Sequence, residues 1–135
     1  MVKTGLAVLL EDRINELGDA NVGVVANHAS ITADLIHISD ALTDAGVKIK
    51  ALFGPEHGAR GDVADGMEIG DAVDSKLGVP VYSLYGKYKA PTPEMLQGID
   101  IMLVDLQDVG SRFYTFLYTM SEVMIACTDN NIPVW

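Results

Sequence analysis

Apolar positions along the chain follow two periods, and their order predicts the order of helices and strands. Near the N-terminus they recur every three or four residues, at Leu6, Leu10, Ile14 and Leu17. Gly18 follows directly, as is typical of a helix end. The next apolar run, 22–26, is continuous and rich in valine, which indicates a strand that is covered on both faces.

The same alternation continues after this strand. Helical spacing is shown by three apolar residues that precede Gly46: Leu35, Ile38 and Leu42. His37 would then lie inside a second helix, as a surface or packed residue. A strand is expected at 47–53, followed by an irregular segment rich in Gly and Asp at 54–78.

The C-terminal half predicts two more strands, at 79–86 and 99–105, with a short helical turn at 91–98 between them. A last helix is indicated by apolar residues at helical spacing: Phe113, Leu117, Met120, Met124 and Cys127. The end of the chain, 130–135, has the character of a turn that leads into another strand.

Strands that alternate with helices predict an α/β domain with a mostly parallel sheet. The 135 residues suffice for one domain with a core of its own, so we expect a single domain over 1–135. Because the last strand stops at Trp135 almost as it begins, we expect the chain to be a truncated part of a longer protein.

Charge and composition narrow the possible partners. The net charge of −10 opposes binding to nucleic acid or to an anionic membrane, since both require clustered Lys and Arg. No apolar stretch reaches the roughly 18 residues of a membrane span, so we expect no membrane insertion. The single cysteine, Cys127, permits no internal disulfide and is expected to be a small buried side chain. The expected location is cytoplasmic as the chain is given, or periplasmic or secreted if a leader has been removed.

Polar residues gather where the predicted strands end. They are Asn27 and His28, Glu56 and His57, Tyr85, and finally Asp105, Gln107, Asp108 and Arg112. In parallel sheets ligands bind outside the carboxyl ends of the strands. The sequence therefore predicts that four strand exits form one ligand-binding rim.

Glu56 is the first candidate for chemistry at this rim. It lies between the rigid Pro55 and the flexible Gly58, which would aim its side chain into a crevice. Partial burial would raise the pKa of this carboxyl and suit it to general acid catalysis, with His57 to tune or orient it. The alternative is structural: Glu56 caps a neighbouring helix or pairs with Arg60.

The other rim residues leave several possibilities open. Arg112 offers a forked cation to a carboxylate, although it could instead pair with Asp105 while Asp108 or Ser111 caps the last helix. Four residues could ligate a metal, but without any recognisable ligand spacing: His28, His57, Asp105 and Asp108. Phosphate-loop, dinucleotide, serine-nucleophile and zinc-protease motifs are absent, so no cofactor is expected.

Several motifs occur together in a specific order: F-G-P-E-H-G at 53–58, S-L-Y-G at 83–86, P-T at 91–92 and D-x-Q-D-x-G-x-R-x-Y-T at 105–115. With the VGVVANHAS segment at 22–30, they resemble the N-terminal half of the DUF1343, or YbbC-like, family, whose characterised members are exo-β-N-acetylmuramidases of the NamZ type. The resemblance runs from about Val22 to Trp135. It implies a Rossmann-like, doubly wound domain with helices on both faces, as the N-terminal portion of a longer two-domain protein.

The resemblance also implies a function, which is to release N-acetylmuramic acid from the non-reducing end of peptidoglycan fragments of the MurNAc-GlcNAc type. Glu56 becomes the leading general acid/base. The other catalytic candidates are His57, Asp105 and Asp108, and the substrate-binding candidates are Asn27, Arg60, Tyr85, Gln107, Arg112 and Tyr114. Arg112 or Arg60 would bind the lactyl carboxylate. Ala59 departs from the bulkier residue common at this place in the family, which could loosen the loop.

Two hypotheses of other classes remain at this point. One is a non-catalytic sugar-binding or interaction module that forms a homo-oligomer through its unfinished sheet edge. The other is a metal-dependent hydrolase that uses the Asp and His residues of the rim.

Overall fold

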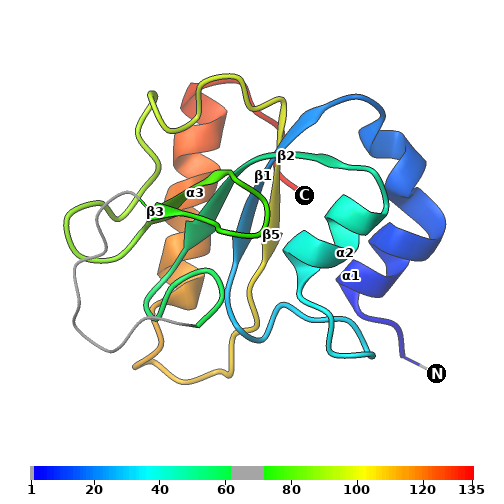
Figure 1. The fold of residues 1–135 in the computed structure, drawn as a ribbon. Coiled ribbons are helices and arrows are strands. Elements are labelled where there is room, and N and C mark those ends of the chain that lie inside the picture. Colours follow the sequence, from blue (N-terminus) through cyan, green and yellow to red (C-terminus); the bar gives the residue numbers. More distant parts are fainter. Residues whose placement is uncertain (1, 62–71) are drawn as a thin grey trace.

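One sheet organises the chain in the computed structural model, which describes residues 2–61 and 72–135. Within these residues the sheet has five strands in the order β3-β4-β2-β1-β5 (Figure 1). They are β1 (Asn21–Ala26), β2 (Lys48–Gly54), β3 (Ala72–Val73), β4 (Pro80–Ser83) and β5 (Ile101–Asp105). All neighbouring strands are parallel except β3, which runs antiparallel to β4. The predicted mostly parallel α/β fold is confirmed.

Helices cover both faces of this sheet. Those in the described residues are α1 (Gly5–Val8), η1 (Leu9–Arg13), η2 (Ile14–Leu17), α2 (Ile38–Asp44) and α3 (Phe116–Asp129). Figure 1 shows α1 and α2 on one side of the sheet and α3 on the other. Successive residues of β1 belong to two separate apolar clusters. Val24 packs in the cluster that contains residues of α1 and α2, and Val25 packs in the cluster that contains residues of α3. The doubly wound arrangement is therefore confirmed.

The opening helix is confirmed, but it changes winding along its length. A short α-helical turn is capped by Thr4, whose hydroxyl accepts a hydrogen bond from the Ala7 N–H at 3.2 Å. A π-type turn and a 3₁₀ turn then follow, up to the predicted stop at Gly18. Leu6 and Leu17, at the two ends of the predicted stripe, are both buried.

The second helix begins later than predicted. Leu35 is 77% exposed and has a left-handed backbone with φ 62°, so it lies in a tight loop and does not belong to the helical stripe. The helix begins at Ile38, and His37 is its N-cap, with its ring accepting from the Ser39 N–H. The prediction that His37 lies inside the helix is therefore wrong.

The last helix has the predicted position but a different buried face. Its buried residues are Phe116, Thr119, Val123 and Cys127. Phe113 precedes the helix and is 95% exposed, while Leu117 and Met124 lie on the exposed side. Both stripes are apolar enough to look like the core side, so periodicity alone selects the wrong one. Cys127 belongs to both stripes and is buried as predicted, and burial raises the pKa of its thiol to about 11.

The chain end continues the sheet. Val134 forms a parallel bridge with Met102 of β5, and the Trp135 N–H donates to the Met102 carbonyl at 2.9 Å. The predicted turn into a further strand is confirmed. Within the predicted irregular segment the structure contains the short strand β3, which the sequence pattern does not predict. The part of this segment at 62–71 lies outside the described residues. In the described part of the chain, no helix has the length and apolar character needed to cross a membrane.

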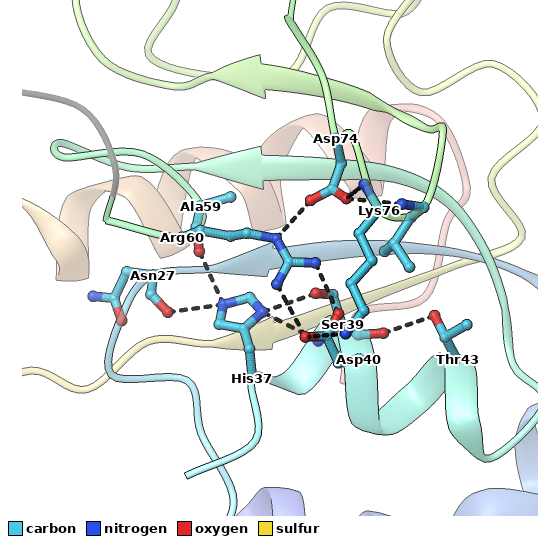
Figure 2. A network of polar contacts seen from close by, with 10 residues as sticks. Asn27, His37, Ser39, Asp40, Thr43, Ala59, Arg60, Asp74 and Lys76 are labelled. Carbon is cyan, nitrogen blue, oxygen red and sulfur yellow. Dashed lines mark hydrogen bonds and ion pairs between the residues drawn. The ribbon is translucent and has the colours of Figure 1, made fainter.

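Arg60 joins α2 to the segment around β3 through an ion-pair network, which we call the Arg60 network and define as Arg60, Asp40, Asp74 and Lys76 (Figure 2). Its guanidinium binds Asp40 with two nitrogens, at 2.9 and 3.2 Å, and donates through Nε to Asp74 at 2.6 Å. Lys76 approaches Asp40 at 3.0 Å. Hydrogen bonding to Arg60 lowers the pKa of Asp40 to about 2, despite the opposing effect of burial.

Arg60→Met should destabilise the fold, because it leaves two largely buried carboxylates without their shared cation. We expect the free energy of unfolding in urea to fall by about 2 to 3 kcal/mol, below the cost of breaking a fully buried pair because Arg60 retains some exposure. Lys48→Met is the matched control: the ion pair of Lys48 with Asp19 is exposed, and its loss should cost less than about 1 kcal/mol. Equal losses in both variants would contradict the structural role of Arg60.

The same network gives stability a defined pH dependence. Because the pKa of Asp40 is about 2 in the folded chain against 3.8 for an ordinary Asp, its contribution is complete above pH 3.8 and is lost as the pH falls toward 2. Asp40→Asn should therefore flatten the fall in unfolding free energy over this window. An unchanged pH profile would show that Asp40 does not carry the effect.

Candidate functional site

The register of the parallel strands brings the predicted site residues to one edge of the sheet. Ala26 pairs with Asp105, Val25 with Phe53, and Gly54 with Ser83, so four strands end at nearly the same level. Figure 1 shows the loops that follow β1, β2 and β5 at the same end of the sheet. The prediction that these strand exits share one edge is confirmed.

Asn27 leaves β1 as a buried polar side chain, only 1% exposed. Its Oδ1 accepts from the Ala29 N–H at 2.9 Å and lies 3.4 Å from the Ser30 hydroxyl, which fixes the direction of the amide. The other half of the amide, Nδ2, has no hydrogen-bond partner among the described residues. A buried donor without a partner is costly, which sets this amide apart from the other polar groups of the rim.

Ser30 connects this loop to β5. Its hydroxyl donates to the carbonyl of Asp105, the last residue of β5, and accepts from the Asn27 N–H at 2.9 Å. Gln107 adds a second link through its Nε2, which donates to the Ala29 carbonyl at 3.2 Å. The exits of β1 and β5 are therefore joined by side-chain hydrogen bonds to backbone, and part of the Gln107 amide is used to hold the rim.

The loop after β2 folds back tightly on the strand. A Cβ added to Gly54 would lie 2.3 Å from the Ala59 nitrogen, a distance that no side chain tolerates. The Gly58 N–H donates to the Pro55 carbonyl at 3.0 Å and closes a turn in which His57 has a left-handed φ of 75°. Glycine is usual at such a position, and strain in a non-glycine residue is common at functional sites. Ala59, at the end of this loop, is buried and belongs to the apolar cluster on the α1 and α2 side.

Glu56 and His57 line a depression of about 190 Å³ together with the start of the last helix. The remaining lining residues are Phe113, Tyr114, Thr115 and Phe116. The Thr115 hydroxyl donates to Glu56 Oε2 at 3.4 Å, and Thr115 is the N-cap residue of α3. Glu56 therefore faces an aromatic wall at the N-terminal end of α3. The alternative pairing of Glu56 with Arg60 does not occur, because the Arg60 guanidinium binds Asp40 and Asp74.

In the loop after β5, one polar side chain stabilises the loop and another is exposed to solvent. Asp108 accepts from the Gly110 N–H at 3.0 Å, which stabilises the loop and does not cap α3. Arg112 is exposed, and it forms no ion pair or hydrogen bond with the described residues, so the alternative pairing with Asp105 does not occur. Its forked cation is available to a ligand.

Asp105 is placed apart from Glu56. Burial raises the pKa of its carboxyl, which favours the protonated form. However, Asp105 lines a separate cavity of about 590 Å³ with residues that include Lys3, Arg13 and Trp135, on the α1 side of the sheet. The structure therefore does not place Asp105 and Glu56 in the same depression.

The structure also bears on three further predictions: the positions of Tyr85 and Arg60, and the possible metal site. Tyr85 is exposed just after β4, where its backbone is held by the Ser83 hydroxyl. Arg60 belongs to the Arg60 network and does not line the Glu56 depression. Within 2–61 and 72–135, no group of three or more His, Cys, Asp or Glu side chains is arranged to hold a metal ion, so the metal alternative gains no support there.

Sequence reasoning missed two kinds of residue. The periodicity assigns Phe113 to a helical stripe and leaves Phe116 without a role, although the F-Y-T-F run at the start of α3 supplies the aromatic wall. His37 and Ser30 act through backbone carbonyls of segments distant in sequence, and such acceptors leave no pattern in the sequence.

Known proteins are similar to this chain in sequence and in fold. The family model of the N-terminal domain of exo-β-N-acetylmuramidase NamZ matches residues 22–135. The peptidoglycan β-N-acetylmuramidase NamZ of Bacillus subtilis (strain 168) is 50% identical over 133 residues, which are 98% of this chain and 32% of that protein. Two DUF1343 family proteins of Bacteroides fragilis NCTC 9343 have similar structures. One has a TM-score of 0.88 at 44% identity, over 98% of this chain and 33% of its own.

The second has a TM-score of 0.73 at 31% identity, over 94% of this chain and 31% of its own. The chain thus spans about a third of the length of each of these relatives. Both the sequence match and the structural match cover β1, β2, β4, β5 and the loops of the rim. The chain therefore belongs to the NamZ N-terminal domain family, within the DUF1343 proteins.

Proposed function

We propose that this chain carries the acid–base part of a glycoside hydrolase that releases N-acetylmuramic acid from the non-reducing end of peptidoglycan fragments. Its similarity to a peptidoglycan β-N-acetylmuramidase supports glycosidase chemistry. The observation that carries the proposal is the position of Glu56, at the exit of a central parallel strand, in a depression walled by aromatic side chains.

In this proposal Glu56 is the general acid/base. Cleavage of a glycosidic bond needs a proton for the leaving oxygen, and a carboxyl is the usual donor. The tight loop between Gly54 and Ala59 fixes the backbone of Glu56, while Thr115 orients its carboxyl. The exposed ring of His57, held in a strained conformation beside it, contacts the departing or incoming group. Asp105 and Asp108 stay predictions as further catalytic groups.

Substrate recognition is assigned first to two groups, Arg112 and Asn27, whose side-chain N–H donors have no partner within the described residues. Arg112 binds the lactyl carboxylate of the sugar, because a chain with net charge −10 needs a local cation to hold an anionic ligand. The Asn27 Nδ2 donates to a neutral oxygen of the same sugar. In addition, Tyr85 and Tyr114 offer exposed aromatic surface after β4 and before α3.

Glu56→Gln should abolish sugar release while leaving the fold intact. Removal of a general acid typically costs about 10²- to 10⁴-fold in rate. The measurement is release of N-acetylmuramic acid from its chromogenic β-glycoside and from the MurNAc-GlcNAc disaccharide across pH. Glu122→Gln, on the exposed side of α3, is the matched control and should keep the parental rate. Hydrolysis at an unchanged rate would exclude Glu56 as the general acid, and binding of the sugar without hydrolysis, unchanged in Glu56→Gln, would indicate a binding module instead.

His57→Gly should separate stability from activity. Glycine adopts the left-handed φ without strain, so the free energy of unfolding should rise by up to about 1 kcal/mol, while sugar release should fall at least about tenfold. Leu35→Gly relieves a similar backbone strain away from the rim and should raise stability without changing release. A His57→Gly variant with full activity would show that the strained ring has no part in the reaction.

Asn27→Asp tests the buried donor. The variant keeps an oxygen for the Ala29 N–H and the Ser30 hydroxyl but replaces the Nδ2 donor by an acceptor. We expect the Kd for N-acetylmuramic acid, measured by calorimetry, to rise at least about tenfold, or 1.4 kcal/mol. The exposed change Asn130→Asp should leave the Kd unaltered, and an unaltered Kd in Asn27→Asp would remove this residue from the binding site.

A further inference from the structure

We propose that His37 is a positioning residue that clips the loop after β1 to the loop after β2, and so sets the geometry between Asn27 and Glu56. His37 is no part of the depression around Glu56 and contacts none of its lining residues through a hydrogen bond. It acts on the rim from the α2 side of the sheet. Its effect on turnover rests on the function proposed above, but its effect on the loops does not.

The clip consists of one ring nitrogen between two carbonyl oxygens (Figure 2). His37 Nε2 lies 3.1 Å from the Asn27 carbonyl and 3.0 Å from the Ala59 carbonyl. Asn27 begins the loop after β1, and Ala59 ends the tight loop that carries Glu56. A single side chain therefore holds together two loops that are separated by 32 positions in sequence, the difference between 27 and 59.

The partners of the ring determine where its proton lies. Carbonyl oxygens only accept hydrogen bonds, so Nε2 must carry the proton and donate to both. Nδ1 accepts from the Ser39 N–H at 3.3 Å and lies 2.8 Å from the Ser39 hydroxyl, so it carries none. The ring is thus the neutral Nε2–H tautomer, with each nitrogen used for a different purpose: Nδ1 caps α2, and Nε2 clips the loops.

The surroundings of His37 keep the ring neutral. Burial lowers the pKa of the imidazole, and the nearby Arg60 cation lowers it further, while the two carbonyls and Asp40 act in the opposite sense. Arg60 and Asp40 belong to the Arg60 network, which packs beside the ring (Figure 2). Protonation of Nδ1 would set a donor against the Ser39 N–H and break the cap of α2, so only the neutral Nε2–H ring serves the cap and the clip together.

Two substitutions separate the two uses of the ring. Asn is a good N-cap residue, so His37→Asn keeps an acceptor for the Ser39 N–H, but its side chain is too short to bridge both carbonyls. His37→Ala loses the cap and the clip together. Leu42→Ala is the control for general loosening of α2. Leu42 is fully buried on the same helix, and its apolar side chain cannot donate a hydrogen bond to either carbonyl.

Amide hydrogen-exchange rates measured by NMR report directly on how tightly the two clipped loops are held. The Ser30 N–H donates to the Asn27 carbonyl and the Gly58 N–H to the Pro55 carbonyl, so both report on the clipped loops. In His37→Asn and His37→Ala these amides should exchange at least tenfold faster relative to the Val24 amide of β1. In Leu42→Ala the ratio should not change. Loop amides as protected in His37→Asn as in the parent would overturn the proposal.

Two more readouts complete the test. Ring ¹⁵N shifts of the parent chain should show the Nε2–H tautomer of His37 at neutral pH, and an Nδ1–H tautomer, which leaves Nε2 without a proton to donate, would overturn the proposal. Where sugar release is measured, kcat/KM in His37→Asn should fall at least tenfold, and an unchanged kcat/KM would also overturn it. A parent chain that releases no sugar would contradict the proposed function, while exchange and tautomer would still decide the role of His37.

Discussion

Parallel pairing of β1 with both β2 and β5 is the constraint on which the rest of this molecule depends. It requires β1 to be apolar on both faces, which the valines of this strand satisfy, and it requires helices to return the chain across each face. Parallel pairing also places the carboxyl ends of all the central strands at the same edge of the sheet. Glu56, Asn27 and Arg112 lie in loops at that edge because backbone hydrogen bonding aligns the strands that precede them.

The fold follows from the sequence because burial on both faces leaves a strong local signal. Continuous apolar runs locate β1, β2 and β5 to within two residues, and glycines locate the ends of the first two helices. The face of α3 does not follow, because the stripe that contains Leu117 is at least as apolar as the buried stripe of Val123, which includes Thr119. Only packing against Phe53 and Met102, in strands distant along the chain, selects the stripe of Val123.

The site is predictable only in part, for a related physical reason. Strand exits and the turn chemistry of Pro55 and Gly58 are local, so the sequence by itself indicates Glu56. Charge pairing is not local: Arg60 follows the Glu56 loop in sequence, yet Asp40 and Asp74 bind it on the α2 side. The His37 clip is less visible still, since its acceptors are backbone carbonyls that any residue would supply.

The strand exits, in the function proposed for this chain, form one sugar-binding rim. The most direct test is an amide ¹H–¹⁵N spectrum of the chain titrated with N-acetylmuramic acid. We predict shifts that saturate and that concentrate in 27–30, 55–58 and 106–115, with the rest of the spectrum nearly unchanged. Shifts centred on the cavity beside Lys3, Arg13 and Trp135, or a folded chain that binds no sugar, would contradict the central claim.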